Sequence, residues 1–280
     1  MATLERLIGD HGTLLLDIMG VLINKNGAIE HAPQFVDYLN RKNKPYFILT
    51  NICGDTEIGI YERLRRNGIP LLSPERIISA GSLVHDYLRD HVAAGATVAF
   101  IGPQTCRAVL ETGKHHIVSC GETELFNVLA LLDDEGFPFR ETLEAALTTC
   151  VRCFKDSGKL PLLLLANSDS AYPRNSESYA FGSGIFVTML DEALKKLLSE
   201  SPDVISFGKP SDKMFTEARR RGGDSSMMMI GDQLATDILG ANNFGITSTL
   251  VLTGLNSRQH VIQGGSAPKY VIDNLHIAGM

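Results

Sequence analysis

The chain has 280 residues, of which 44% are hydrophobic and 21% charged, a composition typical of a soluble globular protein with one large domain or two smaller ones. Lys and Arg total 26 against 32 Asp and Glu, so the net charge of −6 leaves no basic surplus for binding nucleic acid. The odd, low number of cysteines indicates reduced thiols, and no apolar run approaches the roughly 20 residues that span a membrane. The first residues also lack the pattern of a signal peptide, so we expect a cytoplasmic protein that binds neither membrane nor nucleic acid.

Short apolar runs of strand length recur along the chain, and most end at a polar residue or a Gly-Pro or Gly-Lys pair. These runs are 13–16, 46–49, 97–101, 128–132, 162–166, 204–207, 227–230 and 247–252. Segments with helical spacing lie between them, among them 33–42, 58–67 and 211–221, the last starting with Ser211 after Pro. Alternating strands and helices predict an α/β fold with a doubly wound, mostly parallel sheet, whose ligands bind at the carboxyl ends of the strands.

Two candidate sites follow the first two runs. Asp17 comes directly after the first run, and Gly20 allows a sharp turn behind it. A carboxylate in that position suits a nucleophile toward phosphorus or a Mg²⁺ ligand, and an Asp that only caps a turn has the same pattern. Thr50 and Asn51 follow the second run, where a hydroxyl and an amide suit the oxygens of a phosphoryl group and equally suit a helix N-cap.

Two further sites lie near the C-terminus. Lys209 stands in a Gly-Lys-Pro turn before a helix, where its charge could hold Asp17 and a phosphate together, or where it could simply be exposed. Asp232 follows another buried run, and Asp237 follows five residues later. With Asp17 they form a set of carboxylates suited to a hard divalent cation, although one capping and one surface Asp would give the same pattern.

The order and spacing of these four motifs resemble the haloacid dehalogenase superfamily of phosphatases over essentially the whole chain. The long gap between Thr50 and Lys209, the GDxxxTD form of 231–237 and the Gly-Ser-Gly run at 182–184 look like the class IIA subgroup, which carries a large α/β cap. That subgroup includes pyridoxal phosphate, nitrophenyl phosphate and predicted sugar phosphatases. The resemblance implies a core formed by 1–93 and 193–280, with an inserted α/β cap at 94–192 that sets the choice of substrate.

The resemblance also implies roles for individual residues. Asp17 would form an aspartyl-phosphate, and Lys209 and Thr50 would bind phosphate with help from backbone amides near Gly20 and Asn51. Mg²⁺ would be held by Asp17, the backbone carbonyl of Met19 and Asp232, with Asp237 supporting the metal site. The expected substrate is a small phosphorylated metabolite such as a sugar phosphate, and the subgroup commonly forms homodimers through the cap.

One residue departs from the family pattern. The usual first motif is DxDG, in which the second Asp transfers a proton, and here that position is Met19. Losing a general acid typically costs ~10²–10⁴ in rate. Another residue could supply the proton, the leaving group could need little protonation, or the protein could be a slow enzyme. The alternatives to a hydrolase are therefore a phospholigand-binding or regulatory protein and a phosphotransferase with weak hydrolysis.

Two polar segments of the expected cap are candidates for substrate contacts. Asn167 and Asp169 resemble the Asn-x-Asp segment near the cap–core junction of the subgroup, although they could serve only to shape a turn. Residues 133–135 form an acidic stretch that could touch substrate or replace the missing acid, and a solvated turn explains it more simply.

Overall fold

The computed structural model describes residues 3–121, 124–173, 178–262 and 266–278. The chain divides into two units, the first made of residues 1–50, 57–79 and 209–280 and the second of residues 51–56 and 80–208. Each unit contains a sheet in which all strand pairs are parallel, which confirms the predicted α/β fold. The predicted insert of 94–192 lies inside the second unit, which also takes in 51–56, 80–93 and 193–208.

The sheet of the first unit has six strands in the order β15-β14-β13-β1-β4-β5. Its central strand β1 (Leu14–Leu16) pairs with β13 (Met228–Gly231) on one side and β4 (Tyr46–Thr50) on the other. The outer strands are β14 (Thr247–Val251), β15 (Tyr270–Ile272) and β5 (Ile77–Ser79). Every residue of β1 and β13 is buried, as expected for strands covered on both faces.

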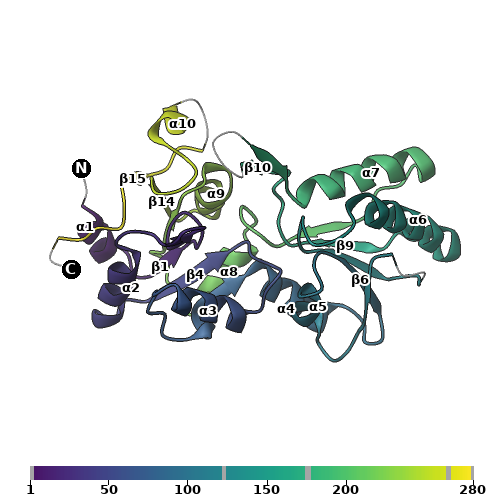
Figure 1. Ribbon diagram of the computed structural model, residues 1–280, viewed down its shortest axis with the longest axis horizontal. Helices are drawn as coiled ribbons and strands as arrows, with labels where there is room; N and C mark the ends of the chain where they lie inside the picture. Colours follow the sequence, from purple (N-terminus) through teal and green to yellow (C-terminus); the bar gives the residue numbers. More distant parts are fainter. Residues whose placement is uncertain (1–2, 122–123, 174–177, 263–265, 279–280) are drawn as a thin grey trace. The chain divides into compact units, whose positions relative to one another are not determined.

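Helices cover both faces of this sheet. From β1 the chain passes through α2 (Ala32–Arg41) to β4, which lies toward the β5 edge of the sheet. From β13 it passes through α9 (Leu239–Phe244) to β14, which lies toward the opposite edge. Because such crossovers are right-handed, the two helices lie on opposite faces (Figure 1). The unit also contains α1 (Leu4–Asp10), a hairpin of β2 (Ile23–Asn24) and β3 (Gly27–Ala28), α3 (Glu57–Arg66), the 3₁₀ turn η1 (Pro74–Arg76), α8 (Lys213–Arg220), the π-helix η2 (Leu234–Ile238) and α10 (Arg258–Ile262).

The predicted start of α8 was wrong by two residues. The sequence pattern placed it at Ser211, whereas the helix begins at Lys213 and Asp212 occupies the N-cap position. The segment before the helix, 208–212, is a run of turns and bends, and its Lys209–Pro210 peptide bond is cis. Ser211 remains in that turn, where its Oγ accepts a long hydrogen bond from the amide of Lys213 at 3.5 Å.

The second unit has a five-stranded sheet in the order β12-β9-β8-β6-β7. Long helices α6 (Phe139–Ser157) and α7 (Gly184–Leu198) pack against each other over one face, with Leu129, Leu163 and Phe186 among the buried core residues (Figure 1). The strands are β6 (Thr97–Ile101), β7 (His116–Ser119), β8 (Val128–Leu131), β9 (Leu162–Leu165) and β12 (Val204–Ser206), and the remaining elements are α4 (Ala80–His91), α5 (Cys106–Leu110) and a hairpin of β10 (Ala171–Pro173) and β11 (Tyr179–Phe181). No helix among the described residues is long and apolar enough to cross a membrane.

Candidate active site

Three strand ends of the first unit carry the predicted site residues. Asp17 follows β1, Thr50 is the last residue of β4, and Asp232 follows β13. Because these strands are adjacent and parallel, their carboxyl ends lie at one edge of the sheet. All three side chains are buried, and Lys209 joins them from the segment before α8. The four distant stretches of sequence therefore meet in one place.

Lys209 lies at the centre of the cluster. Its Nζ donates to Asp17 Oδ1 at 2.6 Å, to Asp237 Oδ1 at 2.7 Å and to the carbonyl of Leu49 at 2.9 Å. The side chain is only 2% exposed, so the alternative of an exposed lysine in a turn is wrong. The three protons of the ammonium group find three acceptors, which fixes the position of the charge against Asp17.

The charges of the cluster shift one another's pKa values. Burial raises the pKa of Asp17 to about 6, with Lys209 opposing the shift and Asp237 adding to it. Burial alone would lower the pKa of Lys209, but the carboxylates of Asp17 and Asp237 raise it above the usual value. Lys209 therefore stays charged at neutral pH, and Asp17 is ionised above a pH of about 6.

Asp237 holds the turn that follows β13. Its Oδ2 accepts the backbone N–H groups of Asp232 and Gln233, both at 3.1 Å, while its Oδ1 accepts Lys209. A Cβ at Gly231 would lie 2.2 Å from the Asp237 carboxyl carbon, so only glycine fits beneath this carboxylate. Both oxygens of Asp237 thus have partners within the protein, which fits a supporting role at the site.

Asp232 has one satisfied and one unsatisfied oxygen. Its Oδ2 accepts the backbone N–H of Leu255 at 2.7 Å, while its Oδ1 is buried and has no hydrogen-bond partner among the described residues. Burial raises the pKa of this carboxyl well above its ordinary value, and Asp237 and Asp17 add to the shift. A buried carboxylate oxygen without a partner is costly unless a ligand binds it.

The donor set fits a hard divalent cation. One oxygen each from Asp17, Asp232 and Asp237 lie within 4.8 Å of one another, and all three side chains are buried. Three carboxylates and one ammonium leave a formal charge of −2 in the cluster, which an ion of charge +2 neutralises. Oxygen donors of this kind are the ligands that Mg²⁺ prefers.

A loop after β14 supports the site, and the sequence analysis missed it. Thr253 donates its hydroxyl hydrogen bond to the carbonyl of Gly20 at 2.7 Å, and the amide of Leu255 binds Asp232. A Cβ at Gly254 would lie 2.1 Å from Asp232 Oδ2, and a Cβ at Gly20 would lie 2.3 Å from the same atom. Both glycines therefore allow backbone to pack directly against Asp232.

The first-motif loop is placed by backbone contacts. Gly20 has a φ of +78°, which favours glycine, and its own N–H donates to the carbonyl of Ile23 at 2.9 Å. That amide is therefore engaged within the loop. The Met19 side chain is 42% exposed, so this position presents a thioether toward solvent. A thioether carries no proton to transfer at the site.

Asn51, Asn167 and Asp169 belong to the second unit. Asn51 donates its Nδ2 to Asn167 Oδ1 at 3.3 Å, and the same oxygen accepts the amide of Asp169 at 3.1 Å. The backbone of 167–169 packs closely on the Gly-Ser-Gly run, because a Cβ at Gly182 would lie 2.2 Å from the Asp169 carbonyl oxygen. Residues 167–169 form a turn, Asn51 contacts it through Asn167, and the role of all three residues toward substrate stays a prediction.

The acidic stretch after β8 is only partly solvated. Asp133 Oδ1 accepts the amides of Asp134 at 2.8 Å and Glu135 at 3.3 Å, so it caps its own turn. Tyr172 donates its hydroxyl to Asp134 Oδ2 at 2.7 Å, and burial raises the pKa of Asp133. The turn-capping interpretation accounts for the Asp133 hydrogen bonds.

Two family models match the two ends of the chain. The model for haloacid dehalogenase-like hydrolases matches residues 14–114, and a second model for hydrolases of the same superfamily matches residues 206–278. Among curated proteins, a glycerol-3-phosphate phosphatase of Gallus gallus is 26% identical, with 98% of this chain and 92% of that protein covered. The 5'-nucleotidase YutF of Bacillus subtilis is also 26% identical, over 93% and 94% of the two chains.

A solved structure has the same fold over nearly its full length. It is a "possible sugar phosphatase, HAD superfamily" from Cytophaga hutchinsonii, with a TM-score of 0.83 and 26% identity. The match covers 99% of this chain and 98% of that one. Both sheets of the present structure thus have counterparts in a known protein of this superfamily.

Proposed function

The chain belongs to the haloacid dehalogenase-like hydrolases, and we propose that it hydrolyses the phosphate monoester of a small metabolite through an aspartyl-phosphate on Asp17. The observation that carries this proposal is the contact of a buried lysine with Asp17 and Asp237, beside an Asp232 oxygen that accepts no hydrogen bond from any residue the structure describes. Such a cluster combines a nucleophile, a fixed positive charge and a set of oxygen donors for a cation. Positioning and charge neutralisation are the main means by which proteins catalyse phosphoryl transfer.

Asp17 is the nucleophile in this proposal. One oxygen of its carboxylate attacks phosphorus, the bond between phosphorus and the ester oxygen breaks, and the electron pair leaves with that oxygen. Water then attacks the phosphorus of the aspartyl-phosphate, which releases inorganic phosphate and restores the carboxylate. Lys209 donates to Asp17 Oδ1 and so holds this carboxylate in place for the attack.

Lys209 and Thr50 hold the phosphoryl group in this proposal. Lys209 keeps its charge because two carboxylates surround it, and Thr50 lies beside Leu49, whose carbonyl Lys209 also contacts. Backbone amides near Gly20 and Asn51 are the proposed additional donors. A fixed positive charge beside the nucleophile stabilises the negative charge that develops on the phosphoryl oxygens.

Mg²⁺ is the proposed cofactor. Asp17, Asp232 and the backbone carbonyl of Met19 would hold it, and Asp237 would support the site through its contacts with the Asp232 turn. A bound Mg²⁺ polarises the phosphoryl group and offsets the repulsion between the phosphate and the carboxylates. Without a cation, the carboxyl groups of Asp17 and Asp232 hold their protons more strongly than an ordinary Asp does, as their raised pKa values indicate.

The substrate is a small phosphorylated metabolite in this proposal. The curated relatives include a glycerol-3-phosphate phosphatase, a 5'-nucleotidase and acid sugar phosphatases of staphylococci. Each of these names describes a substrate that is a phosphate ester of a small polyol, a nucleoside or a sugar. Asn51, Asn167 and Asp169 are the proposed substrate-binding residues of the second unit. Their amide and carboxylate groups suit the hydroxyl groups of such metabolites.

The direct test compares the wild type with Asp17→Asn for Mg²⁺-dependent release of phosphate. The panel contains glycerol phosphate, sugar phosphates, nucleoside monophosphates and p-nitrophenyl phosphate. Asp10→Asn is the matched control, because it makes the same change at an exposed carboxylate that forms an ion pair with Arg6. We expect Asp17→Asn to lose at least ~10³ in kcat and Asp10→Asn to lose nothing; equal activity of wild type and Asp17→Asn would contradict the nucleophile assignment.

Met19 favours a second candidate, a phosphotransferase or phospholigand-binding protein with weak hydrolysis. Because the thioether cannot activate water, an aspartyl-phosphate on Asp17 would be slow to hydrolyse. A rapid release of one equivalent of p-nitrophenol, followed by slow turnover, would favour this candidate. Turnover without such a burst, at rates ordinary for an enzyme, favours the hydrolase.

A further inference from the structure

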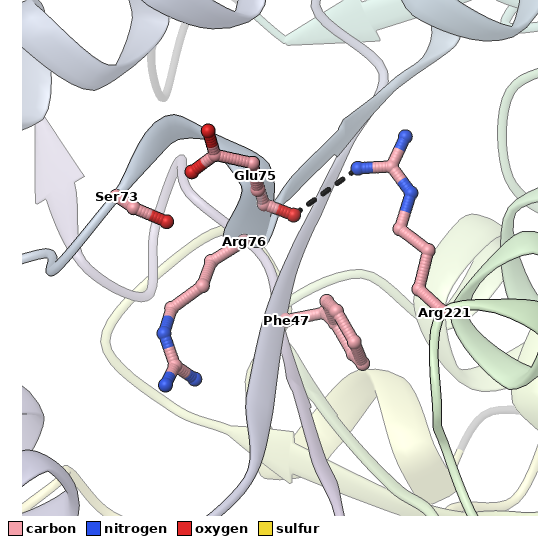
Figure 2. Close-up of a pocket in the computed structure, with 5 residues that line it drawn as sticks. All are labelled: Phe47, Ser73, Glu75, Arg76 and Arg221. Atoms are coloured by element: carbon pink, nitrogen blue, oxygen red, sulfur yellow. Dashed lines mark hydrogen bonds between the residues drawn. The ribbon is translucent and has the colours of Figure 1, made fainter.

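Two pockets of the first unit are lined by residues outside the carboxylate cluster. Figure 2 shows one of them, with Phe47, Ser73, Glu75, Arg76 and Arg221 around it. Its two arginines bind the backbone of the protein itself. Arg221 donates to the Glu75 carbonyl at 3.2 Å, the dashed line of the figure, and Arg76 donates to the Tyr46 carbonyl at 3.1 Å. These contacts explain both cationic groups without a ligand.

The other pocket, with a volume of about 460 Å³, brings two histidines together. His31 immediately precedes α2, and His276 lies in the segment that follows β15. The centres of their imidazole rings are 4.8 Å apart, and the ring planes are tilted by 56°. Two segments from opposite ends of the chain therefore place imidazole groups side by side in one cavity.

The distance between the two rings is the distance that one shared metal ion requires. A bond from zinc to an imidazole nitrogen is about 2.0–2.1 Å long, and the ring centre lies roughly 1.2 Å beyond that nitrogen. Two rings bound to one ion at an angle of about 90–110° therefore have centres roughly 4.5–5.2 Å apart. The observed 4.8 Å falls inside this range. The tilt of 56° lies between the stacked and edge-to-face arrangements that aromatic pairs prefer, so stacking does not explain the pair.

The backbone on both sides of the pair is held by the fold. His276 is exposed, but its neighbours Leu275 and Ile277 are buried, and its own N–H donates to Asn274 Oδ1 at 2.9 Å. The exposed imidazole therefore projects from a segment that is anchored on either side. A ligand at this position starts from a fixed backbone, which lowers the entropy cost of binding an ion.

His31 has a backbone conformation that is uncommon for a residue with a Cβ. Its φ is +70°, and it occupies the N-cap position of α2. Its side chain makes no hydrogen bond to the first turn of that helix, which is the usual use of a polar residue at an N-cap. The imidazole is turned toward His276 instead.

The charges around the pair do not oppose a cation. The charged side chains that line the pocket, Arg258 and Asp273, form an ion pair at 2.8 Å and cancel each other. The exposed carboxylate of Glu30 lies 3.7 Å from His31 Nε2. Among the described residues, no third His, Cys, Asp or Glu completes a preformed set of ligands around the pair. Water would therefore fill the remaining positions around an ion, and the affinity should be moderate.

We propose that His31 and His276 together bind one divalent transition-metal ion such as Zn²⁺. Neutral imidazole nitrogens suit Zn²⁺, Ni²⁺ and Cu²⁺, whereas Mg²⁺ prefers oxygen ligands. The bound ion would connect the start of α2 to the segment after β15. The site is independent of the proposed phosphatase chemistry, because neither histidine belongs to the carboxylate cluster.

The test titrates Zn²⁺ into the full chain by calorimetry, with Mg²⁺ in excess to occupy the carboxylate cluster. We expect one equivalent to bind with a Kd on the order of 10–100 µM, weaker than zinc sites with four protein ligands. His276→Gln and His31→Asn should each weaken Zn²⁺ binding at least about tenfold, because each removes one of two ligands. Asn is chosen at position 31 because, like His, it tolerates a positive φ.

His116→Gln is the matched control for these variants. It removes a histidine of the second unit that is also exposed and also lies beside a carboxylate, with His116 Nε2 at 3.3 Å from Glu124. Because His116 has no second imidazole in contact with it among the described residues, this variant should bind Zn²⁺ as the wild type does.

The outcomes separate this site from the carboxylate cluster. Zn²⁺ binding that survives Asp232→Asn and is weakened in both His276→Gln and His31→Asn supports the proposal, whatever the phosphatase assays show. The proposal is overturned if Zn²⁺ does not bind in excess Mg²⁺, if either of those histidine variants binds as well as the wild type, or if His116→Gln weakens binding as much as they do. Loss of binding in Asp232→Asn also overturns it, because the ion would then occupy the carboxylate cluster.

Discussion

Both units contain a parallel sheet, yet the polar side chains at their strand ends have different partners. In the first unit, Asp17 and Asp232 follow buried strands and share a cluster with Lys209. In the second unit, Asp133 follows β8 and Asn167 follows β9 after one intervening residue each, and each side-chain oxygen accepts amides of its own turn. Within the described ranges, every buried charged side chain lies in the first unit.

This difference shows that a parallel sheet offers a place for a site without supplying its chemistry. The strand-end residues Asp133 and Asn167 of the second unit accept backbone amides of their own turns. Those of the first unit hold charges that no local turn neutralises, and Asp232 Oδ1 has no hydrogen-bond partner in the described part of the chain. Unsatisfied buried charge is therefore the physical mark that separates the candidate active site from an ordinary set of turns.

The largest effect that would test this contrast is expected from Lys209→Met. Removing the ammonium group leaves Asp17 and Asp237 buried together without their counter-charge, which typically costs about 3–5 kcal/mol of stability. The free energy of unfolding, measured with urea, should fall by that amount, and phosphatase activity should be lost. Adding Mg²⁺ should recover part of the stability, because the cation also neutralises the carboxylates.

The matched change in the second unit is Lys196→Met, at an exposed lysine of α7. It should alter the free energy of unfolding by less than about 0.5 kcal/mol. Equal destabilisation by the two variants would contradict the claim that buried charge distinguishes the first unit.

The second prediction concerns Met19→Asp. The side chain is exposed, so a carboxylate can replace the thioether without a burial penalty. A proton donor at this position should raise kcat on alkyl phosphates by about 10²-fold, and by much less on p-nitrophenyl phosphate, whose leaving group departs without a proton. Met19→Leu carries no proton and should leave both rates unchanged. An unchanged or lower rate for Met19→Asp would show that another residue transfers the proton.

The sequence alone predicted those parts of the fold that depend on long apolar runs. All eight runs correspond to strands, with ends that differ by a residue or two. Most of these strands are buried in a parallel sheet, and β12, at the edge of its sheet, is the exception. The hairpin strands β2, β3, β10 and β11 were missed, since none of them coincides with one of these apolar runs. The same holds for β5, β7 and β15 of the parallel sheets. Their pairing depends on neighbouring strands far away in the sequence.

The site residues that lie in short motifs at the ends of apolar runs could be predicted from the sequence. Asp17, Thr50, Lys209 and Asp232 were found in this way, but the burial of Lys209 was not, because its turn looks exposed until the fold places two carboxylates around it. The loop of Thr253 and Leu255 was missed for a different reason. Its contribution comes from one hydroxyl and one backbone amide, which leave no pattern of charge or spacing.

The third prediction uses the pH dependence of Mg²⁺ binding. Burial raises the pKa of Asp17 from 3.8 to about 6, so the metal-free protein loses stability from this group as the pH rises through that window. Mg²⁺ binds the ionised carboxylate, so its affinity should fall as the pH drops below about 6. The apparent Kd, from the Mg²⁺-induced shift in Tm, should rise about tenfold per pH unit for each proton that must leave.

Asp232→Asn is the informative comparison for that titration. It removes the charge of a carboxylate whose Oδ1 has no hydrogen-bond partner within the described ranges, so the Mg²⁺-induced shift in Tm should be small at every pH. Asp133→Asn, at the equivalent strand end of the second unit, should leave the wild-type pH dependence intact. A Mg²⁺ affinity that stays constant between pH 7 and pH 5 would contradict the assignment of these carboxylates as ligands.

The smallest effect is expected from Thr253→Val, which keeps the shape of the side chain and removes one hydrogen bond to Gly20. Because Gly20 packs against Asp232, we expect the variant to position that carboxylate less firmly. The apparent Kd for Mg²⁺ should then rise about three- to tenfold. Thr253→Ser restores the hydroxyl and should restore the affinity. Thr188→Val makes the same change in α7 of the second unit, where the hydroxyl donates to the carbonyl of Gly184 in the same helix. If Thr253→Val lowers Tm as Thr188→Val does and leaves the Mg²⁺ affinity unchanged, the loop contributes to stability alone. The contrast between the two units then rests on the charged residues themselves.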